Sequence, residues 1–132
     1  MASGEVTVIN VTKKTVLAAR AAVADTPRSR RRGLLGTEAL EDGRGLVIVP
    51  CRQIHTFGMR YAIDVVFVDR RMRVLRVAKA MRPRRLGALA LRAAAAIELP
   101  PGKAAATGTA SGDMLEIIAY CPCDAEGARV EV

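Results

Sequence analysis

The segment 63–68 constrains the fold of this chain more than any other part of the sequence. It reads Ile-Asp-Val-Val-Phe-Val, and such a run of β-branched and aromatic residues is typical of a buried β-strand. Further short apolar runs lie at residues 6–11, 46–49, 97–99 and 114–120; a proline follows the second and the third, and Gly-Asp precedes the fourth. Many short strands separated by Gly and Pro turns predict a mainly β domain, built as a β-sandwich or a barrel-like sheet.

One or two short helices are expected beside the strands. Thr26 followed by Pro27 is a typical helix start, because threonine caps a free backbone N–H and proline suits the first helical position. This helix should run to about Leu35 and be closed by the glycine that follows. One or two helical turns are expected within residues 101–108. The alanine-rich segment 16–23 fits either a strand or a helix.

The size of the chain fits a single domain spanning residues 1–132. Hydrophobic residues make up 51% of it, which is enough for a core, and no stretch reaches the length of an apolar membrane span. The first residues show no basic segment followed by an apolar core, so no secretory signal is visible and a cytoplasmic location is expected. The three cysteines are then expected to be reduced.

Residues 55–69 read His-Thr-Phe-Gly-Met-Arg-Tyr-Ala-Ile-Asp-Val-Val-Phe-Val-Asp and resemble the signature of the bacterial and archaeal domain of unknown function 192 family. Segments 24–27, 32–36, 98–102 and 112–113 are similar to the family in order and spacing. The resemblance covers about residues 16–119 and implies a compact, mainly β domain of no established activity. It also implies a strand at the end of the run 93–99, although its alanines favour helix.

The turn after segment 63–68 departs from the family pattern. A hairpin is expected here, with residues 73–78 as the returning strand. Arg71 and Met72 replace the Asn/Asp-Gly-like pair that is usual in the family, so the turn lacks the glycine that a two-residue hairpin prefers. Ala62 likewise stands where a proline is common.

A candidate ligand pocket is expected around His55, Phe57, Met59 and Asp64. His55 is the one histidine of the chain, and in a strand it shares a face with Phe57 and Met59. Asp64 interrupts an apolar run, and a carboxylate buried in a sheet is costly unless it is hydrogen-bonded. These features predict a non-enzymatic accessory or small-ligand-binding module. The alternative is structural, with Asp64 accepting backbone N–H groups of the preceding loop and His55 bonded to a carbonyl.

The positive charge of the chain is concentrated in one segment. The formal net charge is +8, and segment 70–85 alone carries eight cations and no acid. Candidate anion-binding residues in it are Arg70, Arg71, Arg73, Arg76, Arg82, Arg84 and Arg85. They predict a second possible function, binding of an acidic partner or, nonspecifically, of nucleic acid, since no aromatic residue lies among them to stack on bases. The alternative is a solvated face.

A third possible function is a hydrolase or a metal-binding protein that uses His55, Asp64 and the cysteines. Residues of the types that ligate zinc occur at Cys51, His55, Cys121 and Cys123. Their spacing is a poor match, because a strand would carry Cys51 and His55 about 13 Å apart and Cys121-Pro122-Cys123 has one intervening residue instead of two to four. Neither a nucleophile motif nor a phosphate-binding glycine loop occurs, so we predict no cofactor and favour a protein that is not an enzyme.

Overall fold

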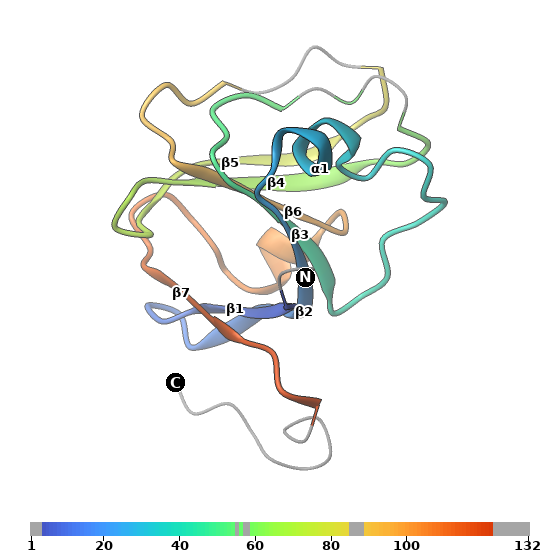
Figure 1. Cartoon of the computed structure of the whole chain (residues 1–132). Helices are drawn as coiled ribbons and strands as arrows, with labels where there is room; N and C mark the ends of the chain where they lie inside the picture. Colours follow the sequence, from blue (N-terminus) through green and yellow to red (C-terminus); the bar gives the residue numbers. More distant parts are fainter. Residues whose placement is uncertain (1–3, 55, 57–58, 85–88, 123–132) are drawn as a thin grey trace.

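The computed structural model describes residues 4–54, 56, 59–84 and 89–122 (Figure 1). In this part the chain forms a seven-stranded sheet of order β5-β4-β6-β3-β2-β1-β7 with two short helices. The strands are β1 (Val6–Asn10), β2 (Thr15–Ala24), β3 (Arg44–Ile48), β4 (Ile63–Val68), β5 (Val74–Met81), β6 (Ala95–Leu99) and β7 (Leu115–Ala119), and the helices are α1 (Pro27–Arg32) and α2 (Lys103–Ala106). The predicted mainly β, barrel-like fold with short helices is confirmed.

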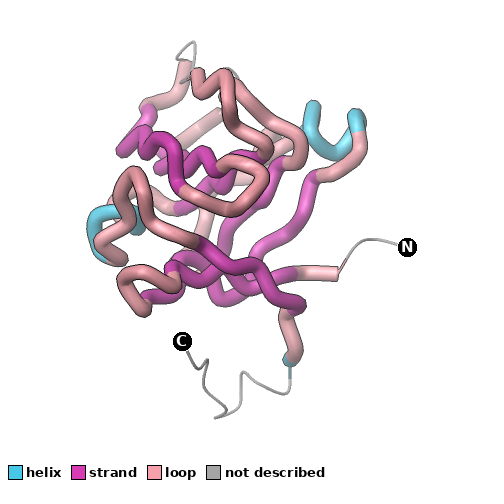
Figure 2. Tube along the Cα trace, turned by 90° about the vertical axis from the view of Figure 1, so that its left-hand side faces the viewer, coloured by secondary structure: helices cyan, strands magenta, loops and turns pink. Residues whose placement is uncertain are grey.

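The sheet curls so strongly that its two edges meet at one end (Figure 2). Arg73, just before edge strand β5, forms an antiparallel bridge with Met114, just before edge strand β7. The backbone N–H of Val74 also donates to the carbonyl of Asp113 at 2.8 Å. Strands β2 and β3 are parallel, so the chain between them must cross over, and this crossover contains α1.

Two apolar cores lie on opposite faces of the sheet, because side chains alternate along each strand. Val66 and Val68 of β4 belong to an inner core inside the curl, where they meet residues of β1, β2, β6 and β7. Val65 and Phe67 belong to an outer core, which Leu34 and the loop before β4 cover. Neighbouring residues of one strand therefore face different surroundings.

Helix α1 begins as predicted and ends earlier. The Thr26 side chain accepts a hydrogen bond from the Ser29 N–H at 3.0 Å, and Pro27 is the first helical residue. The helix ends at Arg32, three residues before Leu35, because Gly33 turns the chain with a φ of 50° that glycine tolerates. The ambiguous segment 16–23 lies within β2.

The hairpin between β4 and β5 forms without a glycine. Met72 takes the left-handed conformation, with a φ of 69°, and its side chain packs against the inner core. Asp69 holds the turn, because its Oδ1 accepts the N–H of Arg71 at 2.8 Å and that of Arg73 at 3.0 Å.

Candidate functional site

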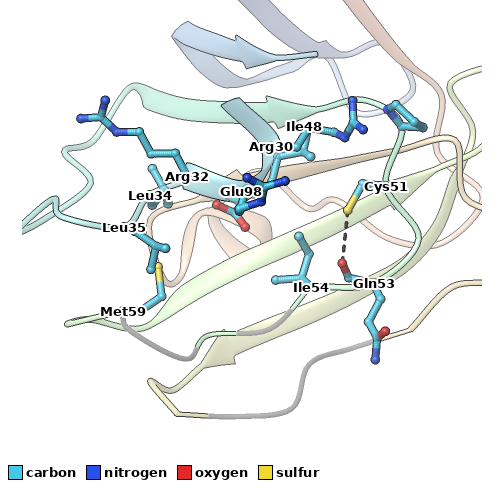
Figure 3. Close-up of a pocket in the computed structure, with 13 residues that line it drawn as sticks. Arg30, Arg32, Leu34, Leu35, Ile48, Cys51, Gln53, Ile54, Met59 and Glu98 are labelled. Carbon is cyan, nitrogen blue, oxygen red and sulfur yellow. Dashed lines mark hydrogen bonds between the residues drawn. The ribbon is translucent and has the colours of Figure 1, made fainter. Parts of the chain in front are cut away.

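A cavity of about 290 Å³ opens on the outer face of the sheet (Figure 3). One wall is α1 with its C-terminal turn, where residues 30–35 line the cavity. The opposite wall consists of residues from the end of β3 and the loop that follows it, between Ile48 and Ile54, together with Met59. Glu98 of β6 reaches the cavity from the sheet beneath (Figure 3). We call this space the Glu98 cavity.

Glu98 is a buried carboxyl group among apolar neighbours. Leu46 of β3 and Val65 of β4 lie directly opposite it in the sheet, and its residual exposure is 5%. Its Oε1 is buried and has no hydrogen-bond partner among the described residues. Burial raises the pKa of Glu98 to about 7. A group with this pKa exchanges between a neutral acid and a carboxylate near neutral pH.

Three consecutive arginines of α1 line the cavity without pairing with Glu98. Arg30 is held at the rim, because it donates to the backbone carbonyls of Asp25 at 3.3 Å and Val49 at 3.5 Å. Arg31 and Arg32 are exposed. No ion pair between described residues includes Glu98. The arginines therefore give the cavity a positive mouth and leave the carboxyl group uncompensated.

Cys51 contributes a protonated thiol to the same cavity. Its Sγ–H donates to the backbone carbonyl of Gln53 at 3.3 Å, as the dashed line in Figure 3 shows. Burial, with a smaller contribution from Glu98, raises the pKa of the Cys51 thiol, and a hydrogen bond and Arg30 oppose this only in part. The thiol thus stays in its neutral form at neutral pH.

The structure separates two residues of the pocket predicted from the sequence. Met59 lines the Glu98 cavity and packs against the outer core. Asp64 follows the alternation of β4 and lies on the other face, opposite Leu99 of the inner core. His55 and Phe57 lie outside the described residues.

Asp64 is fully buried, and its hydrogen bonds explain how β4 accommodates a charge. Its Oδ1 accepts the N–H of Ala80 at 2.8 Å, and its Oδ2 accepts the N–H groups of Gly102 at 3.1 Å and Ala104 at 2.9 Å. The expected donors were in the preceding loop, but these belong to β5 and to the start of α2. Asp64 therefore joins two segments that are distant in the sequence.

The candidate anion-binding arginines lie along the β4–β5 hairpin and beyond it. Arg70, Arg71 and Arg73 surround the turn, Arg76 is on β5, and Arg82 and Arg84 follow that strand; all six are exposed. Arg85 lies outside the described residues. None of the six forms an ion pair with another described residue.

The four candidate zinc ligands are spread over the chain. Cys51 lines the Glu98 cavity, and Cys121 is exposed after β7. His55 and Cys123 lie outside the described residues. Within the described ranges, no group of three or more His, Cys, Asp or Glu side chains is placed to hold a metal ion.

Sequence reasoning missed Glu98 as a site residue, although the signal was present. Glu98 interrupts the apolar run 97–99 as Asp64 interrupts 63–68, and both are carboxylates inside predicted strands.

The family assignment follows from a match over most of the fold. The model of the domain of unknown function 192 family, described as an uncharacterized ACR, matches residues 8–117. The chain belongs to this family. This match includes Glu98, the helix α1 and the loop with Met59. The resemblance inferred from residues 55–69 is thereby confirmed.

Two crystal structures have a similar fold. A protein of unknown function from Novosphingobium aromaticivorans DSM 12444 matches with a TM-score of 0.74 and 25% sequence identity, over 85% of this chain and 83% of that one. A putative transcription regulator from Sinorhizobium meliloti 1021 matches with a TM-score of 0.72 and 18% identity, over 86% of this chain and 92% of that one. A comparison with curated proteins gave no match. In the described part, neither helix is long and apolar enough to cross a membrane.

Proposed function

We propose that this domain binds a small polar molecule in the Glu98 cavity. The observation that carries the proposal is the buried Oε1 of Glu98, which lacks a partner within the described part of the chain and lines an open cavity. A buried polar atom without a hydrogen bond costs about 1–3 kcal/mol, and native proteins retain few of them. A ligand with a hydroxyl or amide group would supply the missing donor.

The cavity supports a narrow class of ligand. Its volume, about 290 Å³, is at the small end of the usual range of ligand pockets, about 300–1,000 Å³. Leu35, Ile54 and Met59 offer apolar contacts, and Glu98 accepts a hydrogen bond. The arginines at the mouth repel cations and attract anions. The ligand we infer is a small neutral or anionic organic molecule with a hydrogen-bond donor at one end.

Binding is better supported than hydrolysis at this cavity. A cysteine nucleophile needs a lowered pKa, whereas burial raises the pKa of Cys51 and its thiol donates to a carbonyl. His55, which the sequence placed in a ligand pocket, precedes Met59 by four residues. We propose that His55 takes part in the same site.

Ligand-detected NMR screening with a library of small hydroxy acids, amino acids and amides tests this function. We expect compounds that bind the wild-type protein to lose at least about tenfold in affinity in Glu98→Met, which removes the acceptor but keeps the size. Glu116→Gln is the matched control, because Glu116 is an exposed glutamate in β7, and it should bind as the wild type does. A library without binders, or binders that tolerate Glu98→Met, would contradict the proposal.

A further inference from the structure

A second hollow lies beside edge strand β5, away from the Glu98 cavity. It has a volume of about 410 Å³ and shares no lining residue with that cavity. Leu75 and Arg76 of β5 form one side, and the segment Leu89–Arg92 forms the other. Leu89 is 45% exposed and Leu91 71% exposed, although both are large apolar side chains. We call this hollow the leucine groove.

One side of the leucine groove, the segment Leu89–Arg92, is anchored by contacts to two other parts of the chain. Arg76 donates from Nη1 to the carbonyl of Leu89 at 2.8 Å, which ties the segment to β5. Gln53 forms an antiparallel bridge with Leu89, and the N–H of Ala90 donates to the carbonyl of Arg52 at 2.8 Å. The two leucines are thus displayed by an anchored backbone, so a partner would not have to order this segment first.

The charge around the leucine groove has one sign. Arg76 and Arg92 line it, and both are exposed. The segment 70–84, which contains β5, carries seven cations and no acid, and none of them is ion-paired with another described residue. Positive potential of this kind attracts acidic partners over about 10 Å at moderate ionic strength.

We propose that the leucine groove docks an acidic peptide segment of a partner protein. An apolar side chain of that segment would occupy the space between Leu75 and Leu91, and flanking Asp or Glu residues would pair with Arg76 and Arg92. Arginines are enriched at protein interfaces, where a buried apolar centre provides affinity and charges provide orientation.

Two other anionic partners fit the groove less well. Nucleic acid would use the arginines but would leave Leu89 and Leu91 in contact with phosphates, and none of the described residues that line the groove is aromatic and able to stack on a base. A membrane surface needs apolar side chains that protrude into it. The leucines here border a hollow, which a peptide side chain would fill and a flat lipid surface would leave empty.

Selection from a displayed library of random short peptides, followed by fluorescence anisotropy with the selected peptides, tests this inference. We expect enrichment of sequences that place Leu, Ile or Phe among acidic residues. Their affinity should fall steeply between about 50 and about 300 mM NaCl, because exposed charges are screened. Leu91→Glu and Arg92→Glu should each weaken binding at least about tenfold.

Matched variants elsewhere on the surface separate docking from general charge or stickiness. Val11→Glu alters an exposed apolar side chain in the β1–β2 turn, and Arg28→Glu alters an exposed arginine of α1 that does not line the Glu98 cavity. Both should bind the selected peptides within about twofold of the wild type, since neither lies in the groove. The inference is overturned if no acidic-apolar motif is enriched, if Leu91→Glu binds normally, or if Leu91→Glu impairs only the binding of DNA or anionic vesicles.

Discussion

Asp64 and Glu98 are buried carboxylates on adjacent strands, yet the protein treats them in opposite ways. Val65, next to Asp64, lies directly opposite Glu98 in the β4–β6 ladder, so the two acids occupy neighbouring positions on opposite faces. Asp64 accepts three backbone N–H groups in the inner core. Glu98 leaves Oε1 without a partner among the described residues and lines a cavity. Of the two, Asp64 has its hydrogen bonds supplied by the fold, and Glu98 is the group that we propose meets a ligand.

The largest expected effect is on the Asp64 side of this comparison. Asp64→Ala leaves three backbone N–H groups in β5 and at α2 without their acceptor, and the free energy of unfolding should fall by about 3–5 kcal/mol. Urea denaturation measures this fall in the free energy of unfolding. Asp42→Ala is the control, because Asp42 is an exposed carboxylate paired with Lys103, and it should cost less than about 1 kcal/mol. A loss below 1 kcal/mol in Asp64→Ala would remove the distinction between the two acids.

The pH dependence of stability should show that ionisation of Glu98 destabilises the fold. Burial raises the pKa of Glu98 from 4.5 to about 7, so the folded protein holds this proton more tightly than the unfolded chain does. Stability is therefore lost as the pH rises from about 4.5 to about 7, on the order of 3 kcal/mol in all. Glu98→Gln has no proton to lose. The difference in unfolding free energy between wild type and Glu98→Gln should follow this window, and a flat difference would contradict it.

A smaller effect, a gain in stability, should come from replacing the carboxyl group of Glu98 with an apolar side chain. At about pH 5 the carboxyl of Glu98 is neutral in the folded protein, and its Oε1, which has no partner among the described residues, still costs about 1–2 kcal/mol. Glu98→Met should therefore stabilise the empty protein by about this amount while it abolishes binding at the cavity. Thermal unfolding measures the gain, and Glu116→Gln should leave the melting temperature unchanged. A destabilised Glu98→Met protein would show that the carboxyl group is structural, like Asp64.

The smallest effect concerns the wall of the Glu98 cavity. Thr26→Ala removes the cap of α1 and should lower stability by about 1 kcal/mol. Thr26→Ser keeps the hydroxyl group and is the matched control. Because the cap is lost, hydrogen exchange should become faster in α1, which carries the arginines at the cavity mouth. It should be unchanged at the backbone N–H groups that bond to Asp64. Equal acceleration at both places would mean that the two regions open together.

The sequence predicted the positions of the strands better than the roles of the two buried acids, Asp64 and Glu98. Segment 63–68 is a strand in the structure because its β-branched run satisfies a local rule, and Thr26 caps α1 for the same reason. The donors to Asp64 are 16 to 40 residues away in the chain, so no local pattern contains them. That no described residue bonds to Oε1 of Glu98 is likewise a property of the folded surroundings. From the sequence, the position of Glu98 in an apolar run indicates only that its burial is costly.

The start of α1 could be predicted from the sequence more accurately than its end. The start of α1 follows from Thr26 and Pro27, whereas its end depends on which glycine turns the chain. Gly33 does so, and the prediction of Leu35 as the last residue was three residues too long. That difference matters for the site, since the turn after Arg32 brings Leu34 onto the outer core and Leu35 to the cavity.

The pairing of β1 with β7 has a consequence for the order in which this domain can be made. Val6 of β1 lies directly opposite Ala119 of β7 in the antiparallel ladder, more than a hundred residues later in the chain. During synthesis, β1 and β2 can form their hairpin early, but the sheet stays open at that edge until the last strand leaves the ribosome. A nascent chain therefore exposes the unpaired β1 edge until β7 is made, and an unpaired strand edge of this kind is prone to pair with other chains.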